Sequence, residues 1–247
     1  MAERLMFNDS CSPKFKHFSR KRQTKLMVHG FGDAAKDSIM FPLMKDAFLA
    51  SGDYNVIAVD WAKLAAAPWY HVAARNTAMA AEKTAAMIDY QVENSGARIE
   101  DFHLIGFSLG AHVVGIAGQN VKSGRIQKIT GLDPAQVLYQ SVPNSMRLDR
   151  GDAELVEIIH TSGGYLAFIE EIGHRDFFPN GGFWPQPGCV LDFVAVCSHQ
   201  RAYYYLAEAI KHGRGFGSTL CTDYNSYKAG MCSNNQMIPI WNDYNNR

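Results

Sequence analysis

The sequence predicts an α/β fold, with a mostly parallel central sheet and helices on both faces. Short apolar segments alternate along the chain with longer segments of helical periodicity, an order typical of β-α-β units. In the middle of the chain, Gly106-Phe107-Ser108-Leu109-Gly110 reads Gly-x-Ser-x-Gly between an apolar run and an Ala/Val/Gly-rich run. That arrangement is typical of a strand, a sharp turn and a helix. The 247 residues are enough for one large domain with a substantial core.

The elements follow from these patterns in chain order. Residues 1–24 are polar and basic and predict a solvated segment ahead of a domain over residues 25–247. Strands are expected at 25–28, 54–61, 102–105, 126–132 and 154–160, and helices at 36–50, 72–94, 109–120 and 199–212. Gly- and Pro-containing surface loops are expected between Gly163 and Cys197.

Composition excludes several classes of protein. The 24 basic and 24 acidic residues give a net charge of zero, and 47% of residues are hydrophobic, which argues against a nucleic-acid-binding surface or a disordered tail. No apolar run reaches 18 residues, so no transmembrane segment is expected. The first residues lack the apolar run of a secretion signal, so we expect either a cytosolic protein or a processed or truncated form of a secreted one.

The five cysteines bear on that choice. Neither Cys189 with Cys197 nor Cys221 with Cys232 has the spacing of a zinc or redox motif. Two disulfides that each close a local loop would suit a secreted protein and would leave Cys11 over. Five unpaired thiols in a cytosolic protein are the alternative. The glycosylation sequon at Asn8 favours secretion.

Ser108 is the candidate nucleophile, and the acid and base of such a site follow the serine in the order Asp or Glu, then His. Asp133 comes directly after the next expected strand, and His199 comes later in the chain. On residue pattern alone, other residues compete with Asp133 and His199 for these roles. The rival acids are Asp149, Asp152 and Asp176, of which Asp176 is the strongest. The rival bases are His29, His112, His160 and His174.

A serine hydrolase also needs donors for the oxyanion that forms on the substrate carbonyl. His29-Gly30-Phe31 follows the first expected strand, where a glycine loop commonly supplies one backbone donor. We expect the N–H groups of Phe31 and Leu109, the residue after the nucleophile, to form this oxyanion hole.

A larger set of motifs resembles the pancreatic-lipase family of animal lipases, especially its arthropod members and its phospholipase A1-like branch. In family order, these motifs are His29-Gly30-Phe31, Val59-Asp60-Trp61, residues 102–112, Gly131-Leu132-Asp133-Pro134-Ala135, Arg147-Leu148-Asp149, Asp152-Ala153, Ile159-His160-Thr161, residues 176–182, Gln186-Pro187-Gly188-Cys189 and residues 197–202. The resemblance implies an α/β-hydrolase fold. It gives no sign of a C-terminal β-sandwich, so colipase binding is not expected.

The resemblance also implies roles for individual residues. It assigns a catalytic triad to Ser108, Asp133 and His199, and the oxyanion hole to Phe31 and Leu109, and it places Asp176 in a structural loop near the site. It implies a structural calcium ion held by Asn144, Arg147, Asp149 and Asp152, whose two carboxylates suit a hard cation. The alternative is a turn that Asp149 and Asp152 form with Arg147. No cofactor is expected for the reaction itself.

In lipases of this family a disulfide at Cys189 and Cys197 brackets a lid. Only seven residues lie between them here, Val190 to Val196, a length that resembles phospholipase A1-type members. The resemblance therefore implies a secreted carboxylic-ester hydrolase that cleaves the sn-1 ester of phospholipids at a membrane or micelle surface. The alternatives are a triacylglycerol lipase and a non-catalytic, yolk-type lipid-binding protein. The loop itself has an alternative interpretation as a strand packed in the core.

Overall fold

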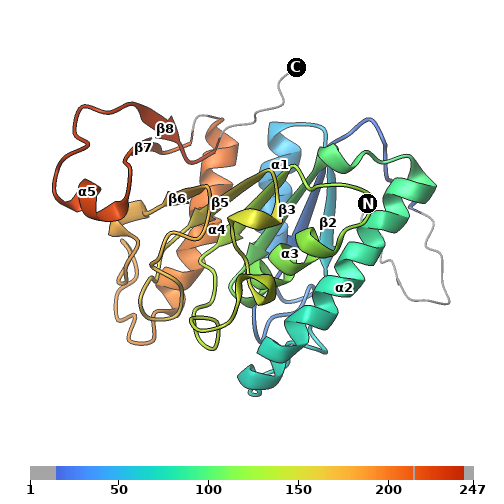
Figure 1. The fold of residues 1–247 in the computed structure, drawn as a ribbon, viewed down its shortest axis with the longest axis horizontal. Coiled ribbons are helices and arrows are strands. Elements are labelled where there is room, and N and C mark those ends of the chain that lie inside the picture. The colour runs from blue at the N-terminus through green and yellow to red at the C-terminus, as the bar shows by residue number, and fades with distance from the viewer. Residues whose placement is uncertain (1–14, 214, 242–247) are drawn as a thin grey trace.

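A computed structural model describes residues 15–213 and 215–241 (Figure 1). Its centre is a sheet of six strands, and each neighbouring pair in it is parallel. This confirms the predicted α/β architecture. In spatial order the strands are β2 (Asn55–Val59), β1 (Thr24–Val28), β3 (Phe102–Phe107), β4 (Lys128–Leu132), β5 (Leu155–Ile159) and β6 (Arg175–Phe177).

Helices cover both faces of this sheet, as the sequence predicts. The helices α2 (Tyr70–Ser95) and α3 (Leu109–Asn120) lie together over one face, while α1 (Met40–Ser51) and α4 (Val196–His212) lie together over the other. Each strand contributes side chains to the core on both faces of the sheet, because successive side chains along a strand point to opposite faces. In β1, Leu26 packs in the core beneath α2 and α3, and the adjacent Met27 packs in the core beneath α1 and α4.

The ends of the strands place the candidate site. Parallel register aligns Phe107 with Leu132, and Leu132 with Ile159. The residues that come directly after these strand ends therefore emerge side by side at the carboxyl edge of the sheet, which is where α/β proteins bind ligands. Ser108 and Asp133 both occupy such positions.

Several boundaries differ from the prediction. The helix α1 begins at Met40 rather than at residue 36, and α4 begins at Val196 rather than at His199, so His199 lies within the first turns of its helix. The strand β6 and a small unit near the C-terminus lack a prediction because their elements are too short for periodicity to show. That unit comprises β7 (Gly217–Thr219), α5 (Tyr224–Lys228) and β8 (Met237–Pro239). Short 3-10 turns lie at Ile99–Asp101, Asn144–Met146, Arg150–Asp152 and Pro179–Gly181.

The described end of the N-terminal polar segment is anchored to the domain. Phe18 packs against the core, and the backbone N–H of Ser19 donates to Oδ1 of Asn55 at 3.0 Å. Periodicity could not predict this, because a few separate residues of an irregular segment make the contacts. The expectations for Asn8 and Cys11 lie outside the described residues. Within the described ranges, no helix is long and apolar enough to span a membrane.

Candidate active site

The glycines around Ser108 explain the shape of the turn between β3 and α3. Ser108 has φ 56° and ψ −121°, a conformation that side chains rarely adopt, and it lies directly before α3. A Cβ on Gly106 would lie 2.2 Å from the carbonyl oxygen of Gly110, and a Cβ on Gly110 would lie 2.4 Å from that of His29. Both glycines are therefore required sterically where strand and helix backbones meet, as the Gly-x-Ser-x-Gly pattern predicts.

Asp133 and His199 lie together at this edge of the sheet. The Nδ1–H of His199 donates to Oδ2 of Asp133 at 2.6 Å, and the aspartate is completely buried. Because the carboxylate accepts, the proton of the neutral imidazole is on Nδ1, which leaves Nε2 as the basic nitrogen. The ring of His199 lies 4.5 Å from that of Phe107, the residue before Ser108. The structure thus brings the three predicted residues to one place.

The carboxylate of Asp133 is held by more than the histidine. Its Oδ1 accepts the backbone N–H groups of Thr161 at 2.6 Å and of Ser162 at 3.0 Å, and its Oδ2 also accepts the hydroxyl of Ser162. Sequence reasoning missed the roles of Thr161 and Ser162. The one signal that could have found them is their position in the chain, because both residues follow closely after β5, at the same edge of the sheet.

The loop after β1 lies against Ser108. A Cβ on Gly30 would be 2.9 Å from the Cβ of Ser108, so only glycine lets this loop come so close. His29 fixes the loop from inside the core, since its Nδ1 bonds to the carbonyl of Gly30 at 2.8 Å and its Nε2 accepts the N–H of Trp61 at 3.2 Å. Phe31 follows directly and packs its ring on Tyr70 at 5.2 Å. The other expected oxyanion donor, Leu109, is the first residue of α3, where backbone N–H groups have no partner within the helix.

The rival residues have other partners. Asp176 accepts a hydrogen bond from Nε2 of His160 at 2.9 Å, so neither of the two is paired with His199 or Asp133. The ring of His112 stacks on Tyr139 at 3.7 Å, and burial lowers its pKa to about 3. The Nδ1 of His174 accepts the backbone N–H of Val156 at 3.0 Å. These residues serve the fold.

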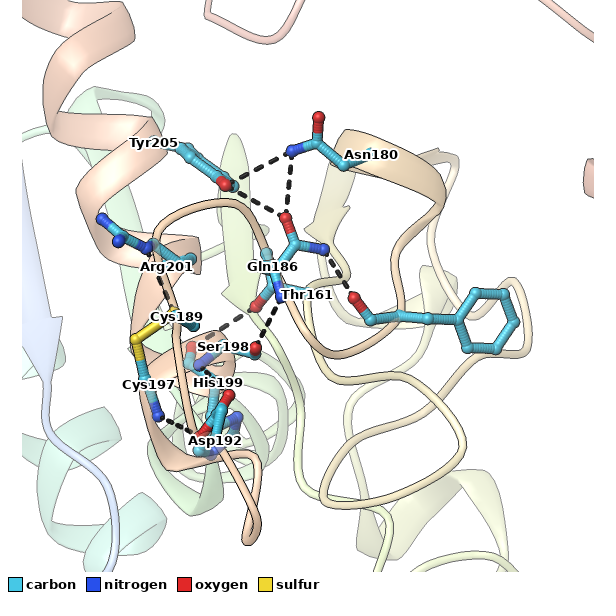
Figure 2. Close-up of a disulfide and its surroundings, with 11 residues drawn as sticks. Thr161, Asn180, Gln186, Cys189, Asp192, Cys197, Ser198, His199, Arg201 and Tyr205 are labelled. Atoms are coloured by element: carbon cyan, nitrogen blue, oxygen red, sulfur yellow. Dashed lines mark hydrogen bonds between the residues drawn. A yellow bond between two sulfur atoms is a disulfide. The ribbon is translucent and has the colours of Figure 1, made fainter.

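A disulfide between Cys189 and Cys197 closes the seven-residue loop beside His199 (Figure 2). A second disulfide, Cys221–Cys232, closes the C-terminal unit, so the two pairings that the sequence allowed are both present. Figure 2 also shows the carboxylate of Asp192, which belongs to the first loop, bonded to the start of α4. This carboxylate and the two cysteines are the one group of possible metal ligands that cluster among the described residues, and the disulfide removes both thiols from that role.

Most of the loop from Val190 to Val196 is exposed, although Ala195 is buried, and this contradicts its interpretation as a core strand. Val190 is 86% exposed, Leu191 76% and Phe193 77%. Further large apolar side chains are exposed on the loops and helix starts that follow the carboxyl ends of β2, β4, β5 and β6, namely Trp69, Val72, Val137, Leu138, Tyr165, Phe183 and Trp184. Together with the loop, these residues form what we call the apolar rim. Their place at the edge of the sheet that carries Ser108 makes the apolar rim a candidate interaction surface.

The four residues expected to hold calcium share one segment, but their side chains already have hydrogen-bond partners within the protein. The Oδ1 of Asn144 accepts from Arg147 at 2.7 Å, and the carboxylate of Asp149 accepts the N–H of Gly151. Asp152 accepts from Gln119 at 2.7 Å and from the N–H of Asp149 at 2.9 Å, and burial raises its pKa to about 7. The aspartates form a reciprocal turn with each other, and Arg147 takes no part in it. As arranged, these side chains do not form a calcium cage, and calcium binding stays a prediction.

The sheet order and the serine turn are those of an α/β-hydrolase fold, and the buried Asp–His pair beside the turn makes this edge of the sheet a candidate serine-type site. The chain belongs to the lipase family, whose model matches residues 4–239, and its relatives include the pancreatic lipases. This confirms the resemblance seen in the sequence.

Individual relatives share much of the chain. It is 34% identical to lipase member H-A of Xenopus laevis over 94% of this chain and 51% of that protein. It is 37% identical to rat pancreatic lipase-related protein 2, over 89% and 51% respectively, and 36% identical to human inactive pancreatic lipase-related protein 1, over 92% and 52%. The chain spans about half the length of the curated relatives it matches.

A solved structure described as a hydrolase of the alpha/beta superfamily, from Xanthomonas campestris, superposes with a TM-score of 0.51. The superposition covers 79% of this chain and 99% of that one at 13% identity, which supports the fold alone.

Proposed function

We propose that this protein is a carboxylic-ester hydrolase that cleaves acyl esters of lipids, with Ser108, His199 and Asp133 as its catalytic triad. The observation that carries the proposal is the buried 2.6 Å bond between Asp133 and His199 beside a serine held in a strained turn. Strain of this kind persists only where the surrounding structure holds it, and such positions cluster at functional sites.

The proposed reaction follows from these positions. The Nε2 of His199 takes the proton of Ser108 as the hydroxyl attacks the ester carbonyl, and Asp133 stabilises the imidazolium that forms. The N–H groups of Phe31 and Leu109 stabilise the oxyanion. The histidine then protonates the leaving alcohol, and water releases the acid from the acyl-enzyme by the same steps. Nucleophile, base and oxyanion donors all come from the chain, so we expect the reaction to require no cofactor, and calcium at residues 144–152 would be structural.

The apolar rim supports a lipid rather than a small soluble ester as the substrate. Its side chains lie on loops at the carboxyl edge of the sheet, where Ser108 also lies, so they are placed to enter a membrane or micelle surface while the substrate reaches the serine. The short loop between Cys189 and Cys197 leaves little chain to cover the site. We therefore propose a phospholipase A1-like preference for the sn-1 ester of phospholipids. Two disulfides support an extracellular location.

A fluorogenic assay on sn-1-labelled phospholipid beside triglyceride tests the proposal, with Ser108→Ala as the control. We expect the wild type to hydrolyse the phospholipid faster and Ser108→Ala to lose activity on both substrates. A reversed preference would favour a triacylglycerol lipase. If wild type and Ser108→Ala are folded and equally inactive, the protein is instead a lipid-binding member without catalysis, which remains the second candidate because one relative at 36% identity is named inactive.

A further inference from the structure

Ser162 contacts both members of the Asp133–His199 pair. Its side chain is completely buried, its hydroxyl donates to Oδ2 of Asp133, and the same hydroxyl oxygen lies 3.4 Å from Nδ1 of His199. Its backbone N–H donates to the other carboxylate oxygen at 3.0 Å. One residue therefore contacts both oxygens of the acid and the nitrogen that this acid orients.

The geometry points to Ser162 as a positioning residue of the site: we propose that its hydroxyl fixes the carboxylate of Asp133 and limits how strongly that carboxylate holds the imidazolium of His199. This inference rests on the proposed function.

The argument for position is a count of acceptor directions. A carboxylate offers about four, and here the N–H groups of Thr161 and Ser162 and the Ser162 hydroxyl use three of them. The direction that remains on Oδ2 faces Nδ1 of His199. Without the hydroxyl, His199 itself would be the one recorded partner left on Oδ2, so the carboxylate could turn about Oδ1 together with the ring that it orients.

The argument for base strength concerns charge. A hydroxyl that donates to Oδ2 draws on the same negative charge that stabilises the imidazolium. Removing it concentrates that charge on His199, so the histidine stays protonated to higher pH. Asp192, from the disulfide-closed loop, is another charged group that interacts with His199. Asp192 is unchanged when Ser162 is replaced, so a shift in the titration of His199 in such a variant would report on the lost hydroxyl.

The test compares Ser162→Ala with Ser162→Cys, which keeps the shape of the side chain and a weak donor in a slightly larger group. The control is Thr84→Val, which deletes a buried hydroxyl bonded to Ala80 in α2, outside the site. For Ser162→Ala we expect kcat/KM on a soluble ester to fall about tenfold. The acidic limb of its pH profile should move up by about half a pH unit. Ser162→Cys should fall between it and the wild type, and Thr84→Val should match the wild type in both respects. An unchanged limb in a folded Ser162→Ala overturns the proposal, as does a limb that moves equally in Thr84→Val.

A second readout does not need activity. The ring signals of His199 are titrated by NMR in the Ser108→Ala background, with and without Ser162→Ala or Ser162→Cys. A midpoint that rises when the hydroxyl is lost supports the role of Ser162 even if no ester substrate is found, and an unchanged midpoint overturns it. The titration therefore distinguishes failure of the proposed enzymatic function from failure of the proposed role of Ser162.

Discussion

The carboxylate of Asp192 accepts the backbone N–H of Ser198 at 2.8 Å, and Ser198 directly precedes His199. Its other oxygen accepts the N–H of Cys197 at 3.1 Å. A side chain of the exposed loop thus binds the first N–H groups of the helix that carries the candidate base, a favourable place for a negative charge. Figure 2 shows this connection beside the disulfide. Two hydrogen bonds from one side chain therefore join the loop to the start of α4.

The substitution Asp192→Asn tests that connection. Burial raises the pKa of Asp192, but bonds from Ser198 and Cys197 and the charge of His199 outweigh it and lower the pKa overall. The amide in this variant keeps an acceptor but loses the charge, so we expect the imidazolium of His199 to be less stable and the acidic limb of the pH profile to move down. Asp223→Asn is the matched control, because Asp223 caps α5 through Ser226. Equal profiles for the two variants would contradict the connection.

The exposed loop itself is tested with Leu191→Ser and Phe193→Ser together. A deletion of residues 190–196 would also remove Asp192, so point changes separate lipid contact from the support of α4. We expect hydrolysis of phospholipid vesicles to fall at least tenfold, because about 2 kcal/mol or more of apolar burial in the lipid surface is lost. Hydrolysis of a short soluble ester should stay within twofold. Leu49→Ser, an exposed apolar residue of α1, is the control. Equal losses on both substrates would show that the loop supports the site rather than contacts lipid.

Gly30→Ala should separate activity from folding. Its Cβ would lie 2.9 Å from that of Ser108, so the loop carrying Phe31 must move away from the serine. Losing one oxyanion donor typically costs about a hundredfold in rate, and we expect a loss in kcat of about that size. Thermal unfolding should show a folded protein in the same preparation. Full activity in Gly30→Ala would contradict the assignment of the Phe31 N–H as an oxyanion donor.

His112 gives a prediction for stability against pH. Its folded pKa of about 3 lies below the unfolded value near 6.5, so the unfolded chain binds the proton first as pH falls. The stability it contributes is complete above about pH 6.5 and is lost towards lower pH, by roughly 1.4 kcal/mol per pH unit at most. Denaturant unfolding between pH 7 and pH 4 measures this slope. We expect His112→Gln, which can still bond to Ala135 and Leu148, to have a shallower slope than the wild type. The same slope in the wild type and in His112→Gln would show that other groups cause the loss of stability at low pH. One such group is His103, because burial lowers its pKa as well.

Sequence reasoning succeeded where the constraint is local. Strand and helix order follows from periodicity. Gly106 and Gly110 mark the turn because no side chain fits at either position. It failed where a contact depends on two segments meeting. The strand β6 has three residues, too few for periodicity, and it supplies Asp176, which the sequence left as a rival acid and the structure pairs with His160.

The sequence by itself determined the fold class, the family and the three residues of the candidate triad, because backbone sterics and strand order act over short stretches of chain. Only the tertiary structure decided which neighbours hold them. Ser162 reaches Asp133 across 29 residues, and Asp192 reaches the start of α4 through the folding of a loop. Such hydrogen bonds depend on distances of about 3 Å, which residue pattern does not specify. The bond between Ser162 and Asp133 exists only once the parallel strands β4 and β5 have aligned their ends.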